Sequence, residues 1–389
     1  MPRAGRSLQL CAVQAAFKCD YDANYNARVK SWDVVIIGGG IIGLSLAISL
    51  RKQGLRVLVV ERGEPGREAS SAAAGMLVGS GTELPPALHA VAAESARMYP
   101  EFVHELEDES GLKVDLRDQG TILISANGGF PDCAEKLSTE KLSAIEPDLA
   151  TSASSDPTAA ARGRPPLRMA YIPERSVDPR ALVAAVVKAA SHRGVDISSG
   201  SEVQALITSG GRATGVQTDK TNYPAEIVVN CAGAWAGGVV PQRFPVHPVK
   251  GQMVAVVGGP KLQHVIRGDS VYMVPRSDGR IVIGSTLEQA GYNKQTHVET
   301  IQRLLHAARE LVPGMANSKI HEDWAGLRPA TPDHLPLLGR TSIPGYFVAA
   351  GHYRDGILLA PITAQLMTEL ISGNPVSHDL APFSPMRFE

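Results

Sequence analysis

A glycine-rich turn between an apolar strand and an apolar helix constrains the fold of this chain more than any other feature. Residues 33–43 (DVVIIGGGIIG) begin with β-branched residues and continue into helical spacing that extends to Gln53. Gly54 can end that helix, and residues 56–60 (RVLVV) supply a second apolar strand. The order of strand, turn, helix and strand predicts a βαβ unit.

The three glycines of this fingerprint have separate functions. Gly38 permits the tight turn, Gly40 lets a pyrophosphate approach the backbone at a helix N-terminus, and Gly43 allows the helix to press against the sheet. Glu61 follows the second strand, 18 residues past Gly43, where an acidic side chain accepts hydrogen bonds from the ribose hydroxyls of an adenosine. The unit therefore predicts a nucleotide cofactor. Glu61 argues against a 2′-phosphate but leaves NAD and FAD open.

Two segments near the N-terminus could be confused with membrane or export signals. Residues 34–50 carry no charge, but they are short for a bilayer span and the triple glycine breaks their helix, so no membrane span is predicted. Residues 1–30 resemble an export signal only faintly, because Gln9 and Gln14 interrupt the apolar part and no clear cleavage site follows. We interpret residues 1–30 as an N-terminal extension: an amphipathic helix, a mobile arm or an overextended start.

Length and charge restrict the class of protein and its partners. A chain of 389 residues is long for one compact domain and predicts two lobes. A net charge of −1 provides no field for nucleic acid or an anionic membrane, so small-molecule partners are favoured. The four cysteines have neither disulfide-framework nor zinc-site spacing, which predicts reduced thiols in a cytoplasmic protein without a metal. The oligomeric state, including a homo-oligomer, stays open.

The middle of the chain predicts a second structural unit. Residues 114–124 are interpreted as a strand and hairpin with a turn at 118–120, and residues 151–166 as a Ser/Ala/Pro-rich surface loop. A helix is predicted from Pro179 to Arg193, after Asp178, followed by short strands over 196–230. Residues 249–257 and 272–284 favour strands of an antiparallel sheet.

Residues 228–235 (VVNCAGAW) form an apolar strand that runs into small residues. Such residues allow close approach of a ligand, although tight packing alone is the commoner reason for them.

Five ordered motifs between residues 31 and 375 carry a resemblance to a known family. They are SSAAAGML at 70–77, PVKGQ at 248–252, WAGLRP at 324–329, TPDHLPLLG at 331–339 and GHYRDGILLAP at 351–361. Together with the glycine turn they resemble the flavin-dependent D-amino acid oxidase superfamily, and within it the glycine oxidases associated with thiamine biosynthesis.

The resemblance implies an α/β fold with a Rossmann-like FAD-binding domain and a substrate domain on an antiparallel sheet. The implied FAD-binding domain is discontinuous, over 31–110, 171–235 and 321–389, and the substrate domain covers 111–170 and 236–320. The resemblance implies FAD as a non-covalent cofactor, because Leu327 and its neighbours offer no thiol for covalent attachment. The implied FAD-contacting residues are Gly38, Gly40, Ile41, Ile42, Gly43, Glu61, Arg62, Ser70, Ala74, Gly75, Met76, Val203, Gly233, His352, Tyr353, Arg354, Asp355, Gly356, Ile357 and Leu358.

The resemblance also implies the substrate site. Arg328 matches the arginine that binds the substrate carboxylate, and a guanidinium suits this role because its planar fork makes two parallel charge-assisted hydrogen bonds. Tyr272 and Arg354 match the other carboxylate-contacting positions. The implied reaction is hydride transfer from the α-carbon of glycine to FAD, followed by hydrolysis of the imine to glyoxylate and ammonia and by reoxidation with oxygen to give hydrogen peroxide. No acid or base residue is required if the amine enters neutral.

Two positions depart from the glycine oxidase pattern. Leu287 stands where those enzymes carry a methionine, and Ser270 stands where a histidine can precede the tyrosine. Both border the expected substrate site, so the choice among glycine, sarcosine, proline and small D-amino acids stays open. A dehydrogenase that passes electrons to another acceptor, and a non-catalytic FAD-binding protein, are the remaining alternatives.

Overall fold

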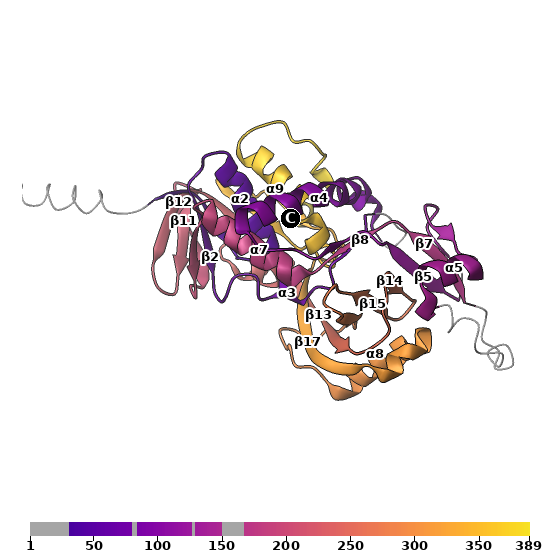
Figure 1. The fold of residues 1–389 in the computed structure, drawn as a ribbon. Coiled ribbons are helices and arrows are strands. Elements are labelled where there is room, and N and C mark those ends of the chain that lie inside the picture. Colours follow the sequence, from indigo (N-terminus) through magenta and orange to yellow (C-terminus); the bar gives the residue numbers. More distant parts are fainter. Residues whose placement is uncertain (1–30, 80–83, 127–128, 150–166) are drawn as a thin grey trace, which may run out of the picture.

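The predicted βαβ unit is present and lies at the centre of the first of two large sheets (Figure 1). Strand β1 (Trp32–Ile37) leads into helix α2 (Ile41–Lys52), and β2 (Val57–Glu61) lies parallel to β1. The computed structural model describes residues 31–79, 84–126, 129–149 and 167–389. The predictions for residues 1–30 and 151–166 therefore lie outside the described residues.

The first sheet is mainly parallel, with an antiparallel extension. Its order is β10-β11-β12-β1-β2-β9, and β19 pairs with β12 and with β18. The buried residues of β1 and β2 are apolar on both faces, as expected for parallel strands covered on both sides. The other strands are β9 (Asp196–Ser199), β10 (Val203–Ser209), β11 (Arg212–Thr218), β12 (Asn222–Asn230), β18 (Leu337–Arg340) and β19 (Tyr346–Ala350).

Helices cover one face of this sheet. The alternate residues Val34 and Ile36 pack into a core formed with α2, α4 (His89–Ser110), α7 (Pro179–His192) and α9 (Gly356–Ile371). Helix α7 begins after Asp178 as predicted, and the Asp178 carboxylate caps it by accepting a hydrogen bond from the backbone N–H of Arg180. The opposite face packs against a second core that includes the short helix η2 (Gly233–Gly238).

Two hydrogen bonds from α4 fix the first turn of α9. The fully buried hydroxyl of Tyr99 donates to the carbonyl of Ile357 at 2.5 Å, and Ser95 Oγ donates to the carbonyl of Leu358 at 2.6 Å. Burial raises the pKa of the Tyr99 hydroxyl, so it remains a donor. The start of α9 is therefore held from within the core.

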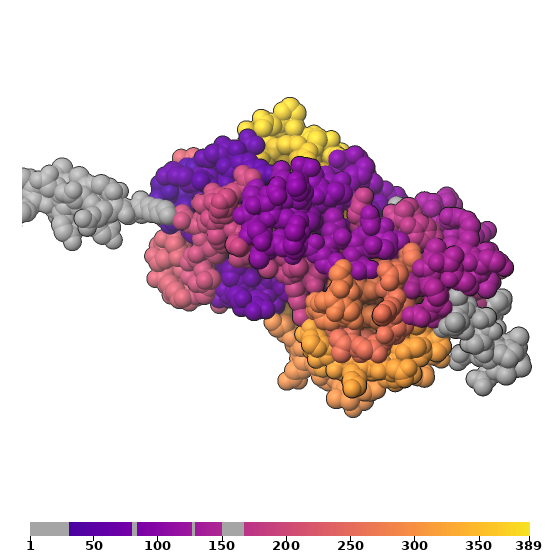
Figure 2. Space-filling view, viewed as in Figure 1, coloured from indigo at the N-terminus to yellow at the C-terminus, as the bar shows by residue number. Residues whose placement is uncertain are grey.

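The second sheet has the order β17-β13-β16-β15-β14-β5-β7-β6. Helix α8 (Val298–Leu311) packs on one face around Val254 and Ile283. Figure 2 shows the orange part of the chain, which includes β17 and α8, at the bottom of the molecule and the yellow C-terminal residues at the top. The strands are β5 (Thr121–Ser125), β6 (Glu135–Lys136), β7 (Arg168–Ile172), β13 (His247–Val257), β14 (Val265–Arg267), β15 (Tyr272–Pro275), β16 (Ile281–Gly284) and β17 (Lys319–Ala330).

A three-stranded sheet, in the order β3-β8-β4, completes the strands among the described residues. Its members are β3 (Met76–Leu77), β4 (Leu116–Arg117) and β8 (Arg175–Val177). The remaining short helices are α3 (Ala69–Ala72), α5 (Thr139–Ile145), η1 (Pro86–Leu88), η3 (Pro313–Asn317), η4 (Ala381–Phe383) and η5 (Pro385–Phe388).

The expected strands over 196–230 and the antiparallel pair β15 and β16 are confirmed. The hairpin predicted within 114–124 is wrong. Strand β4 pairs with β8, whereas β5 pairs with β7 and β14, because Ile122 and Ile124 are required in the core beneath the second sheet. The predicted domain boundary at 320/321 falls inside β17, which pairs with β13 along the second sheet.

The close approach of α2 to β1 yields a stability prediction. A Cβ on Gly43 would overlap the carbonyl oxygen of Gly38 and lie 3.2 Å from the side chain of Ile36. The resulting strain of about 1–3 kcal/mol exceeds the gain of ~1 kcal/mol that alanine brings to a helix. Gly43→Ala should therefore lower the melting temperature.

Gly63→Ala is the matched control, because a Cβ there would meet only Glu61 Oε1 at an ordinary 3.7 Å. Equal melting temperatures for the two variants would show that α2 can move away from the sheet at little cost.

Candidate active site

The glycine turn between β1 and α2 forms a backbone cradle. Gly38 has a φ of 102°, and a Cβ there would lie 2.5 Å from the carbonyl oxygen of Cys231, so only glycine fits. Gly40 occupies the N-cap of α2, and the backbone N–H of Ile41 donates to Ser70 Oγ at 3.0 Å. The cradle leaves the helix N-terminus open to an anionic group, which is the geometry that a dinucleotide pyrophosphate requires.

Glu61 lies at the end of β2 beside this turn. Its Oε2 accepts a hydrogen bond from the N–H of Gly39 at 2.8 Å, and its Oε1 accepts one from the N–H of Gly63 at 2.8 Å. The backbone carbonyl of Glu61 also accepts from the N–H of Ser201, two residues before Val203 begins β10. Glu61 and Val203 therefore lie in the same region, as an adenosine site would require.

A cavity of about 430 Å³ extends from the cradle to the second sheet. It brings together most of the predicted residues, although they come from distant parts of the chain. Gly38, Gly43, Glu61, Arg62, Val203 and Leu358 are absent from its lining. The predicted residues that line it are Gly40, Ile41, Ile42, Ser70, Ala74, Gly75, Met76, Gly233, Tyr272, Arg328, His352, Tyr353, Arg354, Asp355, Gly356 and Ile357.

Arg62 lies outside the cavity in a surface cluster. Its guanidinium stacks 3.6 Å from the ring centroid of Trp235, and Nη2 donates to Glu68 Oε1 at 3.2 Å. The ring of Trp235 also stacks on Tyr292. These contacts hold the Arg62 side chain at the surface beyond the end of β2.

The first turn of α9 faces the cavity. Asp355 occupies the N-cap, but its side chain makes no capping hydrogen bond to the helix. Asp355, Gly356 and Ile357 all line the cavity, so the positive end of the helix dipole points into it. Such an end stabilises negative charge on a bound group.

The turn before α9 is strained and tied to the second sheet. Tyr353 has a φ of 49° and His334 a φ of 60°, and their rings stack with centroids 4.5 Å apart. The left-handed conformation is costly for residues that carry a side chain and is found where other contacts impose it. The N–H of Tyr353 donates to the carbonyl of Pro329 at 2.8 Å, next to Arg328.

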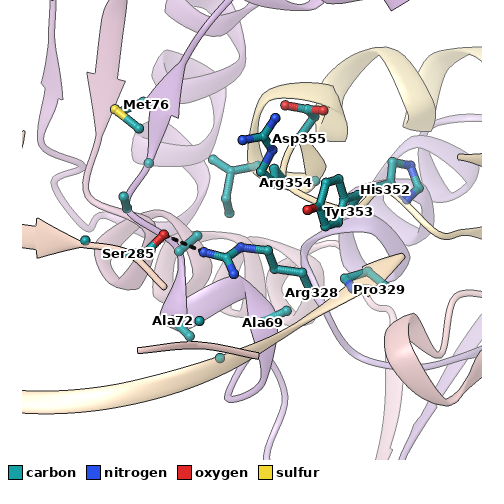
Figure 3. Close-up of a pocket in the computed structure, with 18 of the residues that line it drawn as sticks. Ala69, Ala72, Met76, Ser285, Arg328, Pro329, His352, Tyr353, Arg354 and Asp355 are labelled. Carbon is teal, nitrogen blue, oxygen red and sulfur yellow. Dashed lines mark hydrogen bonds between the residues drawn. The ribbon is translucent and has the colours of Figure 1, made fainter. Parts of the chain in front are cut away.

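The guanidinium of Arg328 is oriented by two hydrogen bonds. Nη1 donates to the carbonyl of Thr286 at 3.0 Å, and Nη2 donates to Ser285 Oγ at 2.6 Å. Figure 3 shows the side chain turned toward Ser285, with the turn that carries Tyr353 and Arg354 above it in this view. The guanidinium covers Gly251, where any Cβ would overlap it. The structure thus presents a fixed fork of donors to the cavity.

Tyr272 is accommodated in the same way by a glycine on a neighbouring strand. A Cβ on Gly284 would lie 2.5 Å from the Tyr272 hydroxyl oxygen, so the absence of a side chain leaves room for the ring. Ser270 and Leu287, the two departures from the family pattern, also line the cavity, and Leu287 is 59% exposed. Arg354 lines the cavity from the α9 side.

Three groups of residues were missed by the sequence analysis. Ser285 and Thr286 orient Arg328, and no local pattern marks a serine or a backbone carbonyl for this role. His334 lies in the quoted motif 331–339 but received no function. Arg276 is buried and donates to the carbonyl of Ala74 at 2.5 Å, which supports the cavity wall from behind. Burial lowers the pKa of this guanidinium, and the nearby carboxylates of Asp178 and Asp115 oppose the shift.

A dinucleotide cradle that opens into a cavity with a fixed arginine fork defines a nucleotide-dependent oxidoreductase. A family model described as FAD dependent oxidoreductase matches residues 33–370. The chain belongs to this family, the DAO family of FAD-dependent oxidoreductases, and it is an enzyme of the glycine oxidase-like type.

Two kinds of curated relative are similar to this chain. Glycine oxidase of Bacillus licheniformis is 34% identical over 366 residues, which is 89% of this chain and 95% of that protein. The bifunctional protein ThiO/ThiG of Synechocystis is 36% identical over 369 residues, which is 92% of this chain. The alignment covers 54% of that protein, so the chain spans about half the length of this bifunctional relative.

A solved structure confirms the fold. The crystal structure of glycine oxidase from Geobacillus kaustophilus superposes with a TM-score of 0.82 at 32% identity, and the match covers 92% of this chain and 99% of that one. The α/β fold with a mostly antiparallel second sheet is therefore the one that the sequence predicted.

Two negative findings apply to the described residues. In residues 31–79, 84–126, 129–149 and 167–389 no helix is long and apolar enough to cross a membrane. The same ranges contain no group of three or more His, Cys, Asp or Glu residues that could hold a metal ion.

His352 yields a prediction about pH. Burial lowers its pKa to about 3, and its Nε2 lies 3.1 Å from Thr363 Oγ1, so the native imidazole is neutral at physiological pH. The unfolded imidazole titrates near its ordinary value of 6.5. The contribution of this pKa difference to the free energy of unfolding is fully present above pH 6.5. It is lost as the pH falls toward 3, because the unfolded chain then binds a proton that the native protein does not.

The measurement compares the wild type with His352→Gln. The melting temperature of the wild type, relative to that of the variant, should fall as the pH is lowered from about 7 to about 5. A difference that is constant over this range would mean that His352 is not held neutral.

Proposed function

We propose that this protein catalyses the FAD-dependent oxidative deamination of glycine, and of small amines or amino acids such as sarcosine and D-alanine, with release of hydrogen peroxide. The products are the imine or glyoxylate and ammonia. Support comes from the family, from relatives named glycine oxidase and from the cavity that joins the cradle to Arg328. The resemblance to glycine oxidases associated with thiamine biosynthesis links this activity to thiazole formation, and the chain is similar to a bifunctional protein named ThiO/ThiG.

The observation that carries this proposal is the fork of Arg328. Two of its nitrogens are held by Thr286 and Ser285, which fixes the plane of the guanidinium before a ligand arrives. A substrate carboxylate bound to such a fork has its α-carbon placed in one position. Tyr272 and Arg354 line the same cavity and would complete the carboxylate site.

The cofactor site fits a non-covalently bound FAD. Gly38 and Gly40 provide the backbone cradle for the pyrophosphate, Glu61 would bind the ribose, and the first turn of α9 would lie against the flavin. Bound FAD would supply the oxidising chemistry of the reaction at this site. Cys231 lines the cavity, but burial raises the pKa of its thiol, which disfavours the thiolate that a covalent attachment would need.

The protein residues bind and orient and do not transfer protons. The neutral imidazole of His352 is bonded to Thr363 within the core, so it is a structural group beside the cofactor site. Tyr272, Arg328 and Arg354 line the cavity and are assigned to binding of the substrate carboxylate. A glycine that enters with a neutral amine needs no base.

The direct test is the visible spectrum of the purified protein, recorded without air before and after excess glycine and then with air and a peroxide assay. Bleaching of the flavin, with peroxide formed on reoxidation, is the expected result. Bleaching by sarcosine, proline or D-alanine but not by glycine would assign a different substrate. Bleaching without peroxide would indicate a dehydrogenase. A flavin that no amino acid bleaches would contradict the proposal.

A substitution tests the carboxylate site. Arg328→Ala should reduce kcat/KM for glycine by a factor of roughly 30 to 1,000, because loss of a charge-assisted bidentate pair costs about 2–4 kcal/mol. Arg212→Ala, at an exposed position of β11, is the control and should keep the wild-type value. An Arg328 variant within a few-fold of the wild type would place the carboxylate elsewhere.

A further inference from the structure

The segment that binds the Arg328 guanidinium is itself attached to the second sheet by an ionic network around one buried lysine. Residues 285–288 follow β16, and Glu288 forms an antiparallel bridge with Lys250 of β13. Each backbone N–H of this pair donates to the carbonyl of the other at 2.9 Å. The segment is therefore anchored at Glu288, two residues after the carbonyl of Thr286 that receives Arg328 Nη1.

Three side chains contact the carboxylate of Glu288. Its Oε1 accepts hydrogen bonds from Thr286 Oγ1 at 2.5 Å and from Gln252 Nε2 at 2.8 Å. Its Oε2 lies 3.5 Å from Lys250 Nζ. These contacts lower the pKa of Glu288 against the opposing effect of burial, so the group is an anion at neutral pH.

Lys250, the lysine of this network, is unusual because its side chain is buried. Lys250 is fully buried, and its ammonium has no hydrogen-bond partner among the described residues. The ion pair with Glu288 compensates this buried positive charge. A buried charge without a counter-ion is strongly destabilising. The Glu288 side chain is 29% exposed, so the lysine is much the more constrained of the two.

The network also includes the hydroxyl of Thr286. The N–H of Gln252 donates to Thr286 Oγ1 at 2.9 Å, so this hydroxyl is held by a backbone donor and by the Glu288 carboxylate. With its hydroxyl fixed on both sides, Thr286 presents its carbonyl to Arg328 in one orientation. Neither Glu288 nor Lys250 lines the cavity.

We propose that Glu288 is a positioning residue for the substrate carboxylate site: its anion, paired with Lys250, fixes Thr286 and through it the plane of the Arg328 guanidinium. The inference rests on the proposed function, because it assumes that Arg328 binds a carboxylate. Loss of Glu288 leaves Arg328 charged and in place but lets its fork rotate. Affinity for carboxylates then falls while the cofactor site, which lies elsewhere, is unaffected.

The test uses the FAD-loaded protein and acetate as the probe. Acetate carries the carboxylate without a reactive amine, and its binding is followed through the change in the visible absorbance of the flavin. Glu288→Gln should raise the dissociation constant for acetate about tenfold and raise KM for glycine more than it lowers kcat. The melting temperature and the retention of FAD report whether the variant is folded.

A second variant tests the same role without leaving an unpaired buried lysine, which could cause misfolding. Lys250→Met combined with Glu288→Ala removes both charges and the anchor of Thr286, and it should also bind acetate about tenfold more weakly. Glu299→Gln, an exposed carboxylate on α8, is the matched control and should retain the wild-type dissociation constant.

The outcomes separate this inference from the proposed function. A wild type whose flavin responds to neither acetate nor glycine would contradict the function itself. A wild type that responds, with folded Glu288 variants that bind acetate as tightly, would overturn the positioning role alone. Weaker acetate binding accompanied by an equal loss of FAD would also overturn it, since that pattern indicates general destabilisation.

Discussion

The rest of the structure depends on the contact of α2 with the sheet at Gly38 and Gly43. Because no side chain separates them, the N-terminus of the helix lies directly over the ends of β1 and β12. The same edge receives Ser70 and the small residues that follow β12. A single close approach thus brings segments from distant parts of the chain together around the N-terminus of α2.

Glycine serves a second purpose on the other sheet. Gly251 on β13 and Gly284 on β16 leave the space that Arg328 and Tyr272 occupy, so the polar groups lie flat against the strands. A flat arrangement leaves the cavity in front of them open. The missing side chains shape this site as much as the arginine does.

Local sequence patterns predicted the βαβ unit, the start of α7 after Asp178 and the antiparallel pair β15 and β16, because each depends on periodicity or on a neighbouring residue. Pairings between strands that lie far apart in the sequence were harder to predict. The turn at 118–120 suggested a hairpin, yet β4 and β5 join different sheets, which only the packing of Ile122 and Ile124 decides. Arg328 was found through a motif, whereas Thr286 and Glu288 act through a carbonyl and a network that no short pattern marks.

The hydrogen bond from the N–H of Tyr353 to the carbonyl of Pro329 joins the turn before α9 to the strand that carries Arg328. The spacing between α9 and Arg328 is consequently a property of the main chain. Ser270 and Leu287 line the cavity and make no contact that sets this spacing among those described above. Under the proposed function, exchange of these side chains could give new amine substrates while the main-chain spacing between α9 and Arg328 is inherited unchanged.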